Sequence, residues 1–141
     1  MGKILCATRG GEASYHTQDA VIALAKEQGD VLVFLYIVDT HFIDKTEYAV
    51  RPDVVNTEME NMGKFLLAMA CERAASQGVE ATPCIKHGEF ASALKEDAVE
   101  KEVSLVALGR PADKESRFQL AHLEKLAAEI TRETSIETRI I

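Results

Sequence analysis

Two glycine-containing segments hold the residues of this chain whose types and spacing fit ligand binding. Arg9-Gly10-Gly11 follows an apolar run, and Gly109-Arg110-Pro111 follows another one much later in the chain. Glycines let a backbone approach a ligand closely, and a guanidinium pairs with a phosphate or carboxylate through two parallel hydrogen bonds. The two segments therefore predict an anion site. The alternative is that both form tight turns, with arginines that lie in solvent or pair with nearby carboxylates.

Asp39 follows an apolar run and is the main carboxylate considered for chemistry. It would accept a hydrogen bond from a ribose hydroxyl or act as a base, or else it is a turn residue. The patterns G-x-S-x-G, G-x-x-x-x-G-K-[ST] and G-x-G-x-x-G, which hydrolases, P-loop proteins and dinucleotide-binding proteins need, are absent from the sequence. We therefore expect no catalytic residue, although a weak nucleotide hydrolase that uses Asp39, Glu12 or His41 stays open.

The histidines and cysteines show no spacing typical of metal ligands, so no metal site is predicted. They are His16, His41, His87 and His122 together with Cys6, Cys71 and Cys84. The cysteines are odd in number, far apart and outside any C-x-x-C pair, which indicates buried thiols in a reducing compartment rather than a disulfide framework.

Length and charge narrow the class of protein. A chain of 141 residues fits one domain, residues 1–141. The formal net charge of −7, from 16 basic and 23 acidic residues, opposes binding to nucleic acid or to an anionic membrane surface. No segment approaches the roughly 20 apolar residues of a membrane span, and the N-terminus lacks the pattern of a signal peptide. We expect a cytoplasmic protein.

Apolar runs alternate with helical patterns along the chain. The strands and helices that these patterns predict must position the two glycine segments. Strands are expected at residues 3–8, 31–38, 79–86, 103–108 and 136–141. Between them, apolar residues recur at helical spacing, including the stripe Val55, Met59, Met62, Leu66 and Met69, which we expect to be buried core. Ser116 and Gln119 fit a capping box at the start of the last helix. Residues 40–51 have no clear period and are expected to form a loop.

This order of elements predicts an α/β fold, a doubly wound parallel sheet with helices on both faces. The run VLVFLYIV at residues 31–38 is apolar on both faces, as is typical of a strand covered by helices on each side. Ligands of such sheets bind beyond the carboxyl ends of the strands, so the loops after the first and fourth strands matter most.

The last expected strand also predicts self-association. Its apolar residues suit an edge strand, where unpaired backbone groups invite a partner strand. The candidate interface of a homodimer comprises Ile136, Thr138, Ile140 and Ile141.

Four segments in their order along the chain resemble the universal stress protein family over nearly the whole length. They are KILCATRGGEAS, VLVFLYIVDTHF, KHGEFASAL and VSLVALGR. The resemblance implies a five-stranded parallel sheet in the order 3-2-1-4-5 and a homodimer often joined through the last strand. It also implies that in some members ATP is held at the loops after the first and fourth strands.

The sequence departs from the ATP-binding members of that family at both loops. Those members carry an Asp after the first strand, in a pattern like V-D-G-S, where this chain has Thr8-Arg9-Gly10-Gly11. They also carry G-x2-G-x9-G-[ST] after the fourth strand, of which only Gly109 remains, with Ala112 at the second glycine. A Cβ atom there removes the backbone freedom and the close approach that a triphosphate loop needs.

Two functions follow from the resemblance and its departures. The leading hypothesis is a non-catalytic stress-response or regulatory protein that does not bind ATP in the usual way, with a protein partner that the sequence does not identify. The alternative is a sensor of ATP, AMP or a small anion, with Arg9 and Arg110 in place of the lost glycines and Val38 and Asp39 at the adenosine side. The candidate ligand residues are Thr8, Arg9, Gly10, Gly11, Val38, Asp39, Gly109 and Arg110.

Overall fold

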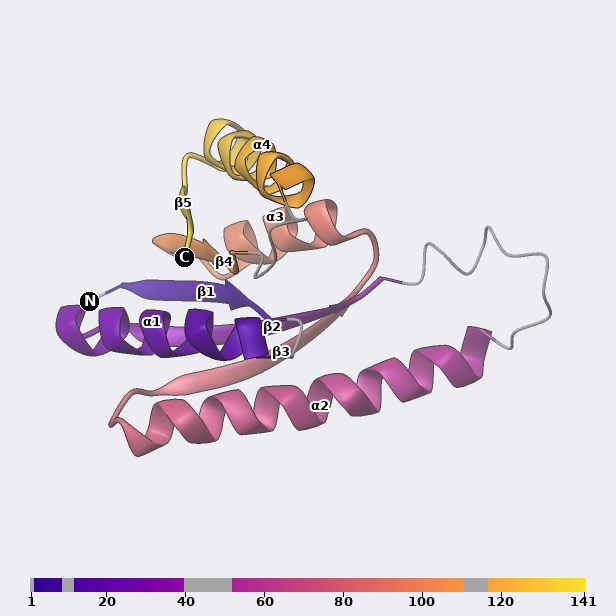
Figure 1. Ribbon diagram of the computed structural model, residues 1–141, viewed down its shortest axis with the longest axis horizontal. Coiled ribbons are helices and arrows are strands. Elements are labelled where there is room, and N and C mark those ends of the chain that lie inside the picture. Colours follow the sequence, from indigo (N-terminus) through magenta and orange to yellow (C-terminus); the bar gives the residue numbers. More distant parts are fainter. Residues whose placement is uncertain (1, 9–11, 40–51, 111–116) are drawn as a thin grey trace.

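A computed structural model describes residues 2–8, 12–39, 52–110 and 117–141 of the chain (Figure 1). Strands and helices alternate along the described residues. They are β1 (Lys3–Ala7), α1 (Glu12–Gln28), β2 (Val31–Val38), α2 (Pro52–Ser76), β3 (Ala81–His87), α3 (Phe90–Glu100), β4 (Leu105–Leu108), α4 (Arg117–Thr134) and β5 (Glu137–Ile140).

The strands form one parallel sheet in the order β3-β2-β1-β4-β5, which confirms the predicted fold class. Helices α1 and α2 cover one face of the sheet, and α3 and α4 cover the other (Figure 1). Strand β1 lies between β2 and β4, so the loops that follow β1 and β4 begin side by side at the same end of the sheet.

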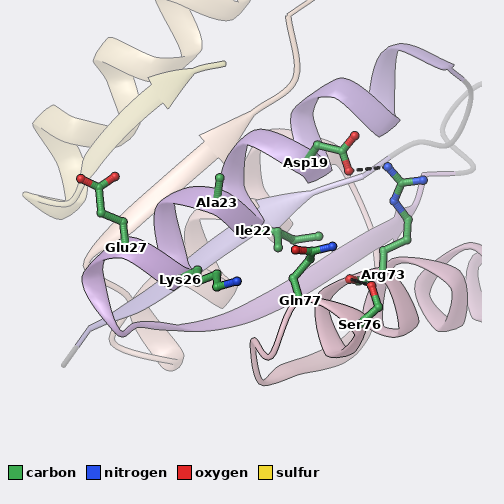
Figure 2. A pocket seen from close by; sticks show the side chains of 8 residues that line it. All are labelled: Asp19, Ile22, Ala23, Lys26, Glu27, Arg73, Ser76 and Gln77. Carbon is green, nitrogen blue, oxygen red and sulfur yellow. Dashed lines mark hydrogen bonds and ion pairs between the residues drawn. The ribbon is translucent and has the colours of Figure 1, made fainter.

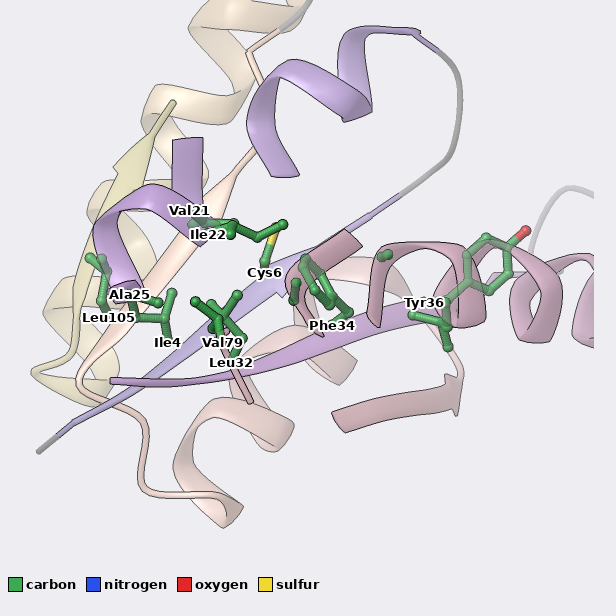
Figure 3. Close-up of a cluster of buried hydrophobic side chains, with 14 of the residues drawn as sticks. Ile4, Cys6, Val21, Ile22, Ala25, Leu32, Phe34, Tyr36, Val79 and Leu105 are labelled. Atoms are coloured by element: carbon green, nitrogen blue, oxygen red, sulfur yellow. The ribbon is translucent and has the colours of Figure 1, made fainter. Parts of the chain in front are cut away.

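Strand β2 shows why its apolar run is continuous. Leu32, Phe34 and Tyr36 point into the layer shared with α1 and α2 (Figure 3), whereas Val33 and Leu35 belong to the core beneath α3 and α4. Apolar side chains are therefore required at successive positions, as in other parallel strands covered on both faces.

The buried face of α2 differs from the predicted methionine stripe. Met62 is 57% exposed, whereas Gly63 is buried against the ring of Tyr36, and the stripe is wrong at that position. The buried face continues through Leu67, Ala70 and Ala74, one residue later than the predicted line, although Met59 and Leu66 still pack partly against the core. The helix turns its smallest residue inward because the sheet already carries a large aromatic side chain there.

Strand boundaries also differ slightly from the predicted ones. Val79 and Val103 are excluded from β3 and β4 because their amides donate to carbonyls of the preceding helices, Ala74 and Ala98. Helix α1 ends, as predicted, at Gly29, whose φ of +70° suits glycine. Two sequence predictions, the loop at residues 40–51 and the capping box that begins at Ser116, lie outside the described residues.

Candidate functional site

The candidate site lies at the carboxyl ends of β1 and β4. Cys6 of β1 is paired in register with Ala107 of β4. Thr8 and Gly109, two positions later, therefore lie close together at the carboxyl end of the sheet. Thr8 is buried, Gly109 is half-buried and Arg110 is exposed. The structure thus brings together the two segments that the sequence singled out, as far as they are described. Arg9, Gly10 and Gly11 lie outside the described residues.

A buried polar pair fills the space beneath the end of β1. The side-chain amide of Gln18, on α1, donates to the hydroxyl of Thr8 at 3.0 Å, and the backbone amide of Thr8 donates to the carbonyl of Leu35 at 2.9 Å. Gln18 is 3% exposed. Gln18 was not among the predicted site residues, although a glutamine beside the buried helix positions Thr17 and Val21 indicates a buried polar contact.

The end of β4 is tied to the end of the last strand. The amide of Arg110 donates to the carbonyl of Ile141 at 3.0 Å, and the hydroxyl of Thr17 donates to the same carbonyl at 3.3 Å. A Cβ atom on Gly109 would lie 3.1 Å from the Thr17 hydroxyl, which is a tight contact. Gly109 therefore already has a packing role before any ligand is considered.

Val38 and Asp39 lie at the end of β2, beside β3 and the start of α3. Val38 is 1% exposed and its side chain belongs to the core, while its carbonyl accepts the amide of Gly88 at 3.1 Å. Asp39 accepts the backbone amide of Phe90, the first residue of α3, at 3.1 Å. The carboxylate thus accepts a hydrogen bond from the N-terminus of a helix. This is a structural role, close to the turn role that the sequence analysis kept as an alternative.

The N-terminus of α3 carries a second carboxylate, that of Glu89. It accepts the amides of Ala91 and Ser92 and, at 2.5 Å, the hydroxyl of Ser92. The hydrogen bond from the Ser92 hydroxyl is the main reason that the pKa of Glu89 is lowered. Two acidic groups therefore meet the positive end of this helix, which leaves it poorly suited to a phosphate.

The groove between α1 and α2 lies apart from the predicted site (Figure 2). It has a volume of about 750 Å³, and none of the predicted ligand residues lines it. Arg73 reaches across from α2 to pair with Asp19 of α1, and its guanidinium lies 4.8 Å from the centre of the Tyr15 ring. The groove is thus spanned by an ion pair that joins the two helices.

The cysteines differ more than the sequence predicted. Cys6 is fully buried, and burial raises the pKa of its thiol to about 12. Cys71 and Cys84 are only partly buried, so the prediction of three buried thiols is wrong for these two. The described residues hold no group of three or more His, Cys, Asp or Glu side chains that could bind a metal ion, and none of the described helices is long and apolar enough to cross a membrane.

The four candidate interface residues lie on or beside β5, at the edge of the sheet. Ile136 and Ile140 pack partly against the core beneath α3 and α4, and Ile141 packs partly against the opposite core. Thr138 is half-buried. The isoleucines therefore already have partners within the same chain.

Comparisons with known proteins agree with this architecture. A sequence model described as the Universal stress protein family matches residues 1–135. Universal stress protein YxiE of Bacillus subtilis (strain 168) is 32% identical, in an alignment that covers 76% of this chain and 77% of that protein.

Solved structures show the same fold at lower identity. A universal stress protein family structure from Burkholderia pseudomallei is 22% identical, with a TM-score of 0.78 over 99% of this chain and 95% of that one. A family protein from Arabidopsis thaliana with AMP bound is 12% identical, with a TM-score of 0.68 over 100% and 91% of the two chains.

Proposed function

The chain belongs to the universal stress protein family, and from this premise we propose that it is a non-catalytic stress-response protein that does not hold ATP in the usual way of the family's ATP-binding members. One observation supports the proposal above all. Two polar side chains described at the strand ends bond within the protein, Thr8 with Gln18 and Asp39 with the amide of Phe90, while the buried Oε1 of Gln18 has no hydrogen-bond partner among the described residues. A function that acts through a protein partner fits such a site better than catalysis does.

The phosphate side of the site supports the same proposal. A triphosphate needs consecutive backbone amides that wrap it, and glycines make that wrapping possible. This chain retains Gly109 but has Ala112 at the second glycine position of the pattern. We infer that ordinary cradling of a triphosphate is lost, and that the protein acts in the cytoplasm as a single domain.

The alternative function is a sensor of a smaller nucleotide or anion. A family structure with the same fold has AMP bound, and Arg110 lies exposed at the end of β4. A monophosphate needs fewer backbone amides than a triphosphate, and a guanidinium can supply two parallel hydrogen bonds to it. Arg9 would act with Arg110 in this alternative.

Calorimetric titration of the nucleotide-stripped protein with ATP and AMP, each with and without magnesium, separates the two functions. The main proposal expects no heat of binding from any of the four titrations at micromolar protein. Micromolar binding that is lost in Arg9→Ala and Arg110→Ala would overturn it in favour of the sensor. Arg132→Ala, an exposed arginine in the last turn of α4, is the matched control and should change nothing.

We also propose a homodimer that forms through β5. The strand has one neighbour, β4, in the described sheet, so its other edge can receive a second strand. Light scattering at micromolar concentration tests this proposal directly, and a monomeric mass would contradict it.

A further inference from the structure

Cys84 lies within a small group of charged side chains between β3 and α3. The ammonium of Lys101 is 3.2 Å from the Cys84 sulfur, and a carboxylate oxygen of Asp97 is 3.9 Å from it. Asp97 belongs to the last turn of α3 and Lys101 is the C-cap residue that follows this helix. Cys84 is only partly buried, unlike Cys6.

Asp97 is the buried centre of this group. It is 0% exposed, and its Oδ1 accepts Lys101 and lies 3.7 Å from the ammonium of Lys86. Its Oδ2 is buried and has no hydrogen-bond partner among the described residues. The carboxylate oxygen nearest the sulfur is thus Oδ1, and Oδ2 is a buried acceptor that no described group satisfies.

Cations outnumber anions in the inner part of the group. Lys86 and Lys101 are about three-quarters buried and face the single buried carboxylate of Asp97, while the Glu100 partner of Lys86 is 63% exposed. Burial lowers the pKa of Lys101, but its hydrogen bonds to Asp97 and Cys84 outweigh this effect, so that the pKa is raised and the ammonium stays charged. A positive charge in contact with the sulfur favours the thiolate, which is the nucleophilic form.

The two other cysteines of the same chain lack this setting. Cys6 is 0% exposed, and burial raises its pKa to about 12. Cys71 is partly exposed on α2, and burial likewise raises its pKa. Cys71 therefore serves as an internal control for Cys84. Both residues are partly buried, but no lysine hydrogen bond to the Cys71 sulfur is found among the described residues.

We propose that Cys84 is a modification site, a thiol that a hydroperoxide oxidises to a sulfenic acid with Lys101 and Asp97 as its positioning residues. The thiol first loses its proton to solvent, and Lys101 stabilises the thiolate. The sulfur then attacks one peroxide oxygen, so that an S–O bond forms and the O–O bond breaks. Sulfur is oxidised by two electrons and the peroxide is reduced. The leaving oxygen takes up a proton from solvent and departs as water or an alcohol.

The first test oxidises the reduced full chain with hydrogen peroxide in the presence of dimedone, which traps sulfenic acids, and follows each cysteine peptide by mass spectrometry. We expect Cys84 to be labelled at least about tenfold faster than Cys71, because the Lys101 ammonium lies against its sulfur. Cys6 should stay unlabelled while the fold is intact. Labelling of Cys71 as fast as Cys84 would overturn the proposal.

The second test asks whether the lysine acts on the sulfur. Lys101→Gln should slow the labelling of Cys84 about tenfold, and Lys101→Arg should restore most of the rate, because it keeps the charge. Lys95→Gln, on the other side of α3 in a pair with Glu129 and Glu133, is the control and should have no effect. An unchanged or faster rate in Lys101→Gln would refute the role of Lys101.

A pH profile of alkylation separates this electrostatic role from a structural one. The titratable groups that face Cys84 are Lys101, Asp97 and Lys86, with Glu100 beside them and the ammonium of Lys3 bonded to the Lys101 carbonyl. The midpoint of the iodoacetamide rate for Cys84 should move to higher pH in Lys101→Gln. The midpoint for Cys71 should stay where it is. Equal shifts at both cysteines would show a loosened fold and contradict the proposal.

Discussion

The sheet has two edge strands, β3 and β5, and their outer edges differ in how they meet solvent. The carbonyl of Glu80 and the amide of Gly88 both bond to β2, so the even-numbered residues of β3 turn their backbone groups inward. The odd-numbered residues then face the open edge, and Pro83 is one of them. A proline at that position has no N–H to offer a second strand, which closes the β3 edge to pairing.

Strand β5 offers its edge without such an obstacle. Ile141 donates to the carbonyl of Leu108 and accepts the amide of Arg110, so the backbone groups of Thr138 and Ile140 turn to the open edge by alternation. Both residues keep their N–H groups. Among the described strands, the two edges therefore differ in the backbone N–H groups that they present, because Pro83 removes one from the β3 edge.

The two edge strands also differ in the side chains that pack over them. Strand β3 lies between α2 on one face and α3 on the other, where Asp97 joins Lys86 of the strand to Lys101, the C-cap residue of α3. Glu137 and Arg139 of β5 lie in register with Leu105 and Ala107, on the α1 face of the sheet, yet both are exposed and pair with each other at 2.6 Å. The β3 edge is therefore stabilised from within the chain, and the β5 edge much less so.

The largest effect is expected from Asp97→Ala, which removes the buried centre of the β3 edge. Two lysines lose their common partner, and a cavity is left beside α3. Because the lysines are about one-quarter exposed and can turn to water, we expect a loss of about 2–3 kcal/mol rather than the full cost of a broken buried pair. Chemical denaturation measures the change. Glu137→Ala on β5 is the control, and a loss there as large as in Asp97→Ala would contradict the contrast between the edges.

Gly63→Ala tests the helix that covers β2 and β3. An added Cβ would lie 2.5 Å from Cδ1 of the buried Tyr36 ring, so the helix or the ring must shift. Overpacking exceeds the gain in helix propensity, and we expect a net loss of about 1–2 kcal/mol in the free energy of unfolding. Ala68→Gly, at an exposed position of the same helix, separates propensity from packing, since it removes a Cβ without relieving any clash. Increased stability of Gly63→Ala in thermal melts would refute this account.

Thr138→Pro should weaken the proposed dimer. The substitution removes an outward N–H from the β5 edge and leaves the inward bonds to β4 in place. We expect the dimer dissociation constant to rise at least about tenfold, which corresponds to about 1.4 kcal/mol. Analytical ultracentrifugation over a concentration series measures it. Pro83→Ala restores an N–H at the β3 edge, so it should not weaken the dimer. A rise in the dissociation constant as large as that of Thr138→Pro would argue against association through β5.

The smallest effect is expected at Glu89, which caps α3 beside the β3 edge. Its pKa is lowered from the usual 4.5, mainly by the hydrogen bond from the Ser92 hydroxyl. A lowered pKa in the folded state means that the contribution is fully present above pH 4.5 and is lost as the pH falls through the folded value. Glu89→Ala should cost about 1 kcal/mol at pH 7 and less near pH 3. Thermal melts at both pH values check it, and a difference that grows toward low pH would contradict the sign.

The sequence predicted the fold well because its signals are local. Continuous apolar runs, helical spacing and the glycine after α1 are each visible within one segment, and the order of the segments led to the family. The candidate site was predicted only in outline. The meeting of Thr8 with Gly109 follows from the strand order, whereas the pairing of Thr8 with Gln18 depends on which side of α1 faces the sheet.

The wrong predictions have one physical cause: each depended on a neighbour in space that a local sequence pattern does not show. The Met62 prediction failed because the helical period fixes a stripe only to within about one residue, and the ring of Tyr36 decided which position must be small. The sequence left Asp39 open between a ligand contact and a turn residue, and the start of α3, which lies beside it in space, donates a hydrogen bond to its carboxylate. Cys84 was expected to be buried and is only partly so, because its exposure depends on how β3 and α3 pack, which no local sequence pattern shows.

The sequence by itself determined the alternation of strands and helices, the likeness to the universal stress protein family and the loss of the second glycine after β4. These properties depend on residue types at fixed spacing along the chain. The tertiary structure alone decided which polar groups bond within the protein, which edge of the sheet stays open, and which cysteine meets a lysine. Such contacts join residues that are far apart in the sequence or on different elements, so their energies depend on distances and burial that exist only once the sheet has formed.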